Sequence, residues 1–320
     1  MTTLAYTDKI RSALRRVGLT PEAVVDILGS CLDTERVFLV GSLAAGLGNA
    51  DSDVDLHVFV TESAPGLVPM LFFANRIRLD LLRYEAGAPA AALAKTPRPS
   101  VPMLGARCAL GALPGMTDLK RLSRWATAVP MHEDTVPLFD EAEMARVSAA
   151  LVRLAVDGTV WAAALASVMQ AGRSAYAPLA WSRAAEAALE VVVRAAGEIF
   201  VGDKWLPTKA RRCGLPPSLL AAARRVGSAT EYARFVDKIG VPTANPSELV
   251  RLCPTDAPQF TFGSRTFRLI DGRLLPPLEP PLDSLERALD KVGGMAVAEA
   301  LMTRAMSISV DPDAIDRRLQ

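Results

Sequence analysis

The stretch that most constrains the fold is residues 37–60, VFLVGSLAAGLGNADSDVDLHVFV. A short apolar run ends in Gly41-Ser42, a small glycine-rich loop follows, and Asp53 and Asp55 lie two apart at the start of a second apolar run. Side chains two residues apart on a strand project from the same face. The spacing therefore predicts two strands joined by a compact loop, with both carboxylates on one face and the alternate apolar side chains in a core.

This pair of carboxylates suggests a bound cation. Two carboxylates held side by side repel each other unless a cation lies between them, and Mg²⁺ is usually held by one or two carboxylates plus substrate phosphates. The alternative is that the acids and Ser52 are turn and cap residues at a strand start, because Asp and Ser are common turn formers. The order of strand, Gly-Ser, glycine-rich loop and Asp-x-Asp favours a metal–nucleotide site.

A third acid, Asp80, lies in the middle of IRLDLLRY, residues 77–84. This segment and residues 70–74 are predicted to form two paired strands. A buried Asp without a partner is costly, so Asp80 either joins the first two acids as a third carboxylate or forms a salt bridge with Arg78 or Arg83. The acids upstream favour the third carboxylate.

Composition limits the classes of partner. The net charge of the 320-residue chain is +1, so it lacks the basic character of a domain that holds long nucleic acid, although a local basic patch remains open. The four scattered cysteines show neither a CxxC pair nor zinc spacing, which fits a reducing cytoplasm. The N-terminus lacks a signal-peptide pattern. No uncharged apolar run reaches the ~18–20 residues that span a bilayer, so we expect a cytoplasmic protein without membrane partners.

The hydrophobic period changes near residue 115, from alternation typical of strands to helical spacing. We expect an α+β protein with a mixed-sheet domain at residues 1–115 and a mainly helical domain at residues 116–320. Within the second, residues 260–275 alternate around Asp271-Gly272, a strong hairpin signal. The polar tail from residue 311 is expected to be loosely held. Helices are predicted over residues 7–17, 21–32, 118–128, 141–171 (one helix or two), 178–200, 216–226, 230–239 and 282–306.

Five residues in this order, Gly41, Ser42, Asp53, Asp55 and Asp80, resemble the nucleotidyltransferases of the DNA polymerase β superfamily. The resemblance covers about residues 35–85. The helical half is similar only loosely to the arrangement in small-molecule nucleotidyltransferases such as the aminoglycoside adenylyltransferases. The implied fold is a mixed-sheet nucleotidyltransferase domain followed by a helical acceptor-binding domain.

The resemblance also implies a role for each matching residue. Gly41 would let the backbone approach the triphosphate, and Ser42 would offer a hydroxyl and an amide to the β and γ phosphates. Asp53 and Asp55 would hold Mg²⁺ or Mn²⁺. Asp80 would bind the metal on the acceptor side or take the proton of the acceptor. The reaction would be in-line attack on the α-phosphate with loss of pyrophosphate.

Three further side chains are candidates for the site. Basic residues cluster in GDKWLPTKARR, residues 202–212, and in this superfamily the helical domain often sends a basic residue to the triphosphate. Lys204 and Lys209 are the candidates, against an ordinary solvated helix end. His57 shares the carboxylate face and either touches the acceptor or hydrogen-bonds at the strand end. Trp205 is expected to be a packing anchor.

The expected activity is that of a nucleotidyltransferase that moves a nucleoside monophosphate, AMP from ATP, to a hydroxyl or amine of a small molecule. Alternatives keep the chemistry and change the acceptor to a protein, a tRNA or a second nucleotide. A non-catalytic nucleotide sensor is a further alternative. The oligomeric state is open.

Overall fold

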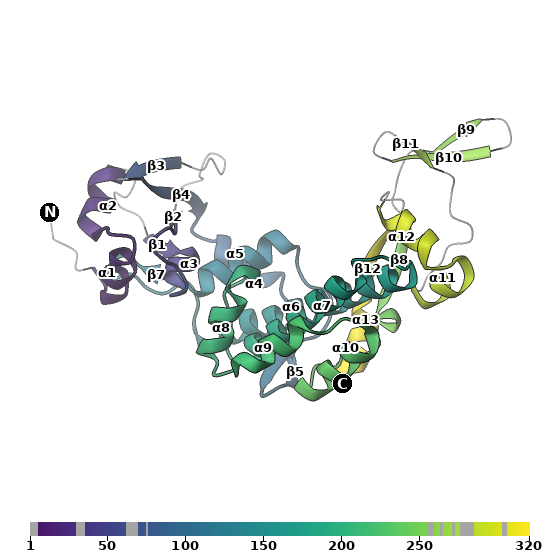
Figure 1. Ribbon diagram of the computed structural model, residues 1–320. Coiled ribbons are helices and arrows are strands. Elements are labelled where there is room, and N and C mark those ends of the chain that lie inside the picture. The colour runs from purple at the N-terminus through teal and green to yellow at the C-terminus, as the bar shows by residue number, and fades with distance from the viewer. Residues whose placement is uncertain are drawn as a thin grey trace. The chain divides into compact units, whose positions relative to one another are not determined.

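The computed structural model describes residues 6–29, 36–61, 70–74, 76–254, 259–262, 265–270, 273–275, 285–302 and 306–320. By internal contacts the chain separates into two compact units, each discontinuous in sequence (Figure 1). Unit 1 comprises Met1–Pro99, Leu113–Leu151 and Gly197–Lys209. Unit 2 comprises Ser100–Ala112, Val152–Ala196 and Ala210–Gln320. The expected domain division at residue 115 stays a prediction.

Unit 1 is built on a five-stranded sheet with the order β3-β4-β2-β1-β7. The pair β2–β4 is parallel, whereas β3–β4, β1–β2 and β1–β7 are antiparallel, so the sheet is mixed. This sheet confirms the expected α+β class. The strands are β1 (Arg36–Val40), β2 (Val54–Val60), β3 (Met70–Ala74), β4 (Ile77–Glu85) and β7 (Val129–Pro130).

One face of the sheet forms the core of unit 1 with helices α1 (Asp8–Arg15) and α2 (Pro21–Leu28). The apolar side chains of both helices belong to the same hydrophobic cluster as the alternate residues of β2 and β4. Each helix starts where the sequence predicts, because the Thr7 and Thr20 hydroxyls accept hydrogen bonds from the Ile10 and Ala23 amides, both at 3.2 Å. These caps satisfy amides that lack a partner within the helix.

The opposite face carries an aromatic cluster next to helix α5 (Met116–Ala126). The Trp125 ring lies edge-on to Phe59 and Tyr84, with ring centroids 5.8 and 5.2 Å apart. The ring centroids of His57 and Tyr84 are 4.8 Å apart. The contacts fix α5 over the same face of β2 and β4 from which Asp55 and Asp80 project. Helices α3 (Gly41–Ala44), α4 (Ala88–Ala94) and α8 (Leu206–Arg212) and the 3₁₀ helix η2 (Asp203–Trp205) also have residues in this unit, as does the start of α6 (Glu141–Ala171).

Helix α6 (Glu141–Ala171) is one continuous helix of 31 residues, which decides between the one helix or two that the sequence left open. By length and composition it is apolar enough to cross a membrane, and 61% of its apolar window is buried. A buried core helix meets the same criteria. The absence of a membrane partner stays a prediction.

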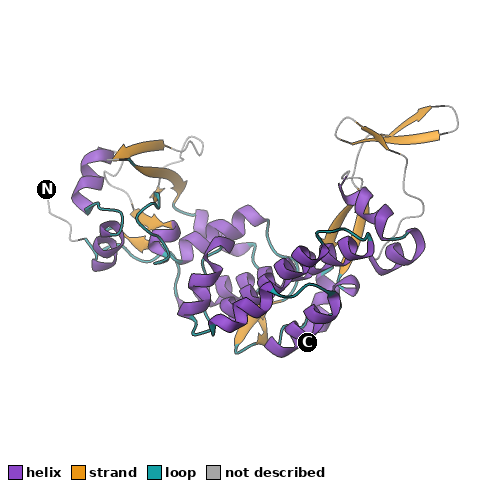
Figure 2. Cartoon of the chain, in the orientation of Figure 1, coloured by secondary structure: helices purple, strands orange, loops and turns teal. Residues whose placement is uncertain are grey.

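The chain after α6 is mainly helical (Figure 2). Its strands form two small sheets, β8–β12 and β9–β10–β11. The predicted hairpin is confirmed, because β10 and β11 pair antiparallel with Ile270 opposite Arg273; the turn residues between them lie outside the described part. The elements are α7 (Ala177–Ala195), α9 (Pro217–Arg224), α10 (Ala229–Ile239), η3 (Pro246–Glu248), β8 (Val250–Pro254), β9 (Gln259–Phe262), β10 (Arg265–Ile270), β11 (Arg273–Leu275), α11 (Leu285–Val292), α12 (Gly294–Met302), β12 (Met306–Val310) and α13 (Pro312–Leu319).

A pair of strands and the C-terminal helix are among the elements that were not expected from the sequence. Strands β5 (Pro99–Met103) and β6 (Ala106–Ala109) pair with each other in a segment without a clear period. The expectation of a loosely held tail is wrong: α13 starts at an Asp311 cap and buries Ala314 and Ile315. The helix is polar on its exposed side, so its local sequence gives little sign of this docking.

Candidate functional site

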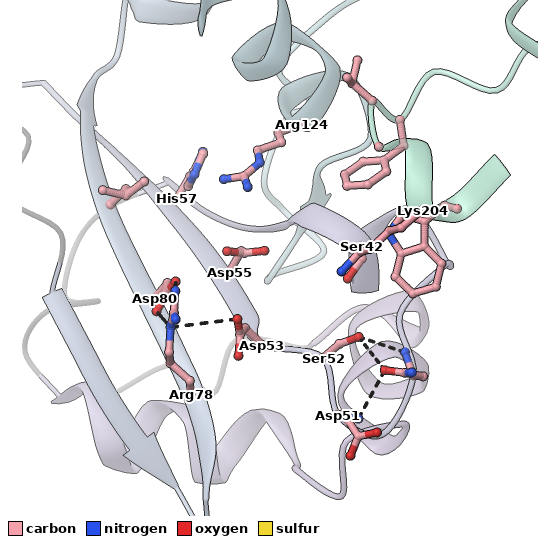
Figure 3. Close-up of a pocket in the computed structure, with 16 residues that line it drawn as sticks. Ser42, Asp51, Ser52, Asp53, Asp55, His57, Arg78, Asp80, Arg124 and Lys204 are labelled. Carbon is pink, nitrogen blue, oxygen red and sulfur yellow. Dashed lines mark hydrogen bonds and ion pairs between the residues drawn. The ribbon is translucent and has the colours of Figure 1, made fainter. Parts of the chain in front are cut away.

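A cavity of about 680 Å³ opens in unit 1 beside the sheet face that carries the acids (Figure 3). It is lined by helix α3, the loop before β2, strands β2 and β4, helix α5 and the segment that precedes α8. The lining residues are Ser42, Asn49, Asp51, Ser52, Asp53, Asp55, His57, Arg78, Asp80, Leu82, Arg124, Phe200, Val201, Gly202, Lys204 and Trp205.

The structure brings the three predicted acids together in this cavity. Asp55 on β2 and Asp80 on β4 are direct partners in the parallel register, so their side chains leave the same face of neighbouring strands. Asp53 immediately precedes β2. Figure 3 shows the three carboxylates around one hollow. Burial raises the pKa of the Asp55 carboxyl; the charge of Arg124 opposes the shift and the charge of Asp80 adds to it.

Asp80 has an internal cationic partner, which was the alternative for this residue. The Arg78 Nε donates to Asp80 Oδ1 at 2.6 Å, and a second guanidinium nitrogen contacts the other carboxylate oxygen. The same Nε lies 3.9 Å from Asp53 Oδ2. Within the described ranges, no group of three or more His, Cys, Asp and Glu side chains is arranged to hold a metal ion. Asp53 and Asp55 are therefore the two of the three acids that do not hydrogen-bond with Arg78.

Gly41 is required by the position of Asp55. Its φ of +76° lies in the region that favours glycine. A Cβ atom added there would lie 2.1 Å from the Asp55 Oδ2 atom. The resemblance assigns Gly41 to the approach of the triphosphate; the geometry gives it a second reason, which is to leave room for a carboxylate.

The loop before β2 separates turn residues from site residues. The Ser52 hydroxyl donates to Asn49 Oδ1 at 3.0 Å and accepts from the Asn49 amide at 3.0 Å. The Asp51 amide donates to the same Oδ1 at 3.3 Å. The turn interpretation thus describes Asn49, Asp51 and Ser52, whereas the side chains of Asp53 and Asp55 take no part in these bonds.

Of the two predicted lysines, the cavity contains one. Lys204 lines it, with Nζ 5.1 Å from the centre of the Trp205 ring. Lys209 is fully buried and does not line the cavity; its Nζ donates to the Phe200 carbonyl at 3.4 Å. That bond holds the segment that presents Phe200 to the cavity, so Lys209 has a positioning contact where a phosphate contact was expected.

Sequence reasoning missed Arg124, a half-buried side chain of α5 that lines the cavity. Within the part of the chain that the structure describes, its guanidinium forms no ion pair or hydrogen bond of its own. Figure 3 shows it above Asp55 and close to His57. No motif distinguishes it from the neighbouring basic residues of α5; only the packing of Trp125 on the sheet turns Arg124 to the acids.

His57 is buried, and its hydrogen bond determines which ring nitrogen carries the proton. The Trp125 Nε1 donates to His57 Nδ1 at 2.9 Å, so the neutral ring carries its hydrogen on Nε2. That atom has no hydrogen-bond partner among the described residues. Burial lowers the pKa of His57 to about 3, and the charges of Arg124 and Arg121 act in the same direction. His57 is thus a neutral side chain anchored to α5 at the cavity wall.

Comparison with protein-family models finds no match, and comparison with curated proteins finds no significant match.

Proposed function

We propose that unit 1 catalyses nucleotidyl transfer, with AMP from ATP as the transferred group and a hydroxyl or amine of a small molecule as the acceptor. The observation that carries this proposal is the in-register pair Asp55 and Asp80, which faces one cavity with Asp53 and with Arg124, whose guanidinium forms no ion pair with a carboxylate of the described residues. Carboxylates for a metal and a free cation for phosphate are the two charge types that phosphoryl chemistry needs. The neutral net charge favours a small acceptor over a long nucleic acid.

The donor set suits Mg²⁺ or Mn²⁺. Asp53 and Asp55 offer oxygen atoms only, and the desolvated Asp55 carboxylate has an electrostatic need for a cation. These two residues would hold the ion, and Asp80 could join them after release from Arg78. When bound, the ion would neutralise the phosphates and orient them.

The remaining side chains have separate tasks in this proposal. Arg124 and Lys204 bind the charged oxygens of the triphosphate, and the Ser42 hydroxyl donates to them. Asp80 accepts the proton of the acceptor. The acceptor oxygen or nitrogen forms a bond to the α-phosphorus while the bond to the leaving pyrophosphate breaks. Positioning and charge neutralisation supply most of the rate.

The Arg78–Asp80 contact favours one second candidate, a nucleotide-binding site without catalysis. If Arg78 holds Asp80 permanently, Asp53 and Asp55 can still bind a metal–nucleotide complex. Asp80 is then not available to accept a proton from an acceptor. The two candidates differ in whether pyrophosphate is released.

The test is incubation with each labelled nucleoside triphosphate, Mg²⁺ and a metabolite extract, with pyrophosphate release as the measurement. Replacing both site acids (Asp53→Asn and Asp55→Asn) should lower the rate by about 10³-fold or more, since charge stabilisation of this kind is worth several kcal/mol. The matched control neutralises two adjacent exposed acids outside the cavity, Glu133→Gln with Asp134→Asn.

Pyrophosphate release that persists in the double variant of the site would sink the catalytic proposal. If the label is found on protein or RNA and not on a small molecule, the acceptor is a macromolecule and the proposed class of acceptor is wrong. Nucleotide binding that depends on Asp53 and Asp55 without any pyrophosphate release would support the sensor.

A further inference from the structure

The open face of strand β3 is apolar although it is exposed. Leu71 and Phe73 are 56% and 69% exposed, whereas Met70 and Phe72, which alternate with them along the strand, pack against the core of unit 1. The strand therefore alternates apolar side chains toward both faces. β3 is also the last strand of its sheet. Two large apolar side chains on an edge strand carry a risk of aggregation, so their presence needs an explanation.

The strand register places this apolar pair beside the acids. Leu71 is the direct partner of Asp80, and Phe73 is the direct partner of Arg78, across the antiparallel pair β3–β4. Cross-strand partners of this kind have Cβ atoms about 5 Å apart on one face. On its other side Asp80 has Asp55 as its partner. The side chains on this face thus run in the order Leu71, Asp80, Asp55 (Figure 1 shows the strand order).

We propose that Leu71 and Phe73 form a subsite for the apolar body of the acceptor, an inference that rests on the proposed nucleotidyl transfer. The nucleophile of the acceptor must reach Asp80. In the proposed reaction Asp55 and Asp53 would hold the metal with the phosphates on their side of Asp80, so the rest of the acceptor would lie on the β3 side. The acceptor is therefore an amphipathic small molecule, with a hydroxyl or amine on an aliphatic or aromatic body.

The size of the apolar pair favours a small molecule over a protein. Specific protein interfaces bury about 800 Å² on each partner, from 20–30 residues. Two side chains on a five-residue strand match one ring or a short alkyl chain. A second copy of the chain could pair with the outer edge of β3, and this occupant is an outcome of the test.

The experiment compares three glucosides with identical sugar hydroxyls: methyl, hexyl and phenyl β-D-glucoside. Their binding to the full chain is measured by saturation-transfer NMR without nucleotide. We expect hexyl and phenyl glucoside to bind about tenfold more tightly than methyl glucoside, which corresponds to partial burial of one apolar group. Leu71→Ser with Phe73→Ser should remove this preference.

The controls are matched in exposure. Leu179 and Tyr176, in unit 2, are 56% and 69% exposed, so Leu179→Ser with Tyr176→Ser removes equally exposed side chains from the unit that does not contain the acids. These variants should keep the preference. Equal binding of the three glucosides by the native chain would overturn the proposal. An equal loss of the preference for hexyl and phenyl glucoside in the β3 variant and in the control variant would also overturn it.

Two further outcomes also decide the proposal. A native dimer that becomes a monomer in the Leu71→Ser, Phe73→Ser variant would assign the face to a second copy. Glucoside preference needs no turnover, so an apolar preference without pyrophosphate release in the test above would reject the nucleotidyl transfer and leave an apolar-ligand subsite. Pyrophosphate release without any apolar preference would reject the subsite alone.

Discussion

Two clusters in this protein contain the same groups, one arginine and two aspartates, and differ in how completely they are closed. In unit 2, Arg153 binds Asp157 and Asp316. In unit 1, Arg78 binds Asp80 and lies close to Asp53. The Arg153 side chain is 1% exposed and that of Arg78 is 47% exposed.

In the Arg153 cluster every side-chain nitrogen of the arginine donates a hydrogen bond. Its Nε donates to Asp157 at 2.7 Å, and its other nitrogens donate to Asp316 and to the carbonyls of Ala109 and Pro312, the last two at 3.2 and 3.3 Å. The Gly111 amide donates to Asp316 at 2.7 Å. Such a network ties α6, the strand β6 and α13 together.

The Arg78 cluster contains more carboxylates than its single arginine binds. Arg78 neutralises Asp80, but Asp55 stands directly beside Asp80 with a pKa raised by burial. Asp53 is half exposed. All three side-chain nitrogens of Arg153 are hydrogen-bonded, so its ion pairs hold structure together. Among the described residues Arg78 donates hydrogen bonds to Asp80 alone of the three acids, which in the proposed function leaves Asp53 and Asp55 for a ligand.

The largest expected effect on stability is that of Arg153→Met. It leaves two carboxylates without their cation; burial already raises the pKa of Asp157 even with Arg153 present. Removing one partner of a buried ion pair costs about 3–5 kcal/mol, so the denaturant midpoint should fall strongly. The matched control is Arg183→Met, because Arg183 is 72% exposed and its pair with Glu186 should contribute less than about 1 kcal/mol. Equal losses in the two variants would contradict a structural role for the closed cluster.

A smaller effect is expected for Gly41→Ala, which tests how the open cluster keeps Asp55 in place. The matched control is Gly18→Ala: its φ is +74° against +76° for Gly41, and an added Cβ would meet nothing within 4 Å. Both variants should lose about 1 kcal/mol from the left-handed backbone. Gly41→Ala should lose about 1–3 kcal/mol more, because its methyl group displaces the Asp55 carboxylate.

Pyrophosphate release should then fail in Gly41→Ala and persist in Gly18→Ala. Urea unfolding measures the first difference and the assay of the proposed function measures the second. Equal stability and equal activity of the two glycine variants would show that the space beside Gly41 is not needed to accommodate the Asp55 carboxylate.

The sequence predicts the fold where local pattern and tertiary contact agree. The alternation in residues 37–60 and 70–84 identifies β1 to β4, and the helices predicted over residues 7–17 and 21–32 correspond to α1 and α2. It fails for α13, because this short polar helix depends on the hydrogen bond that Arg153 donates to Asp316, 163 residues away. A contact of that separation leaves no local pattern.

For the site, spacing along a strand predicts that Asp53 and Asp55 project from one face, because side-chain direction alternates strictly. The position of Asp80 beside Asp55 depends on the pairing of β4 with β2, which spacing within one strand does not determine. The basic residues were harder to predict. Lys209 was expected at the phosphates and is buried against Phe200, whereas Arg124 reaches the cavity only through the packing of α5. Long basic side chains are directed by tertiary packing more than by their position in sequence.

The last prediction concerns Arg78 itself, with the smallest expected effect. Arg78 and a divalent cation compete for the same carboxylates, so Arg78→Met should raise the affinity for Mn²⁺ by about tenfold, as expected for one unit charge removed a few ångströms from the ion near a solvent-exposed surface. The control is Arg83→Met, an exposed arginine of the same strand whose odd-numbered position faces away from the acids. Mn²⁺ binding is measured directly by electron paramagnetic resonance, without nucleotide.

Because Arg78 is an exposed pair partner, its loss should leave thermal unfolding nearly unchanged, in contrast to Arg153→Met. Tighter Mn²⁺ binding with native stability would show that Arg78 acts as a removable counter-ion of the acids. Unchanged or weaker Mn²⁺ binding would place Arg78 with Arg153, as an arginine that only orders its carboxylates, and would remove the distinction between the two clusters.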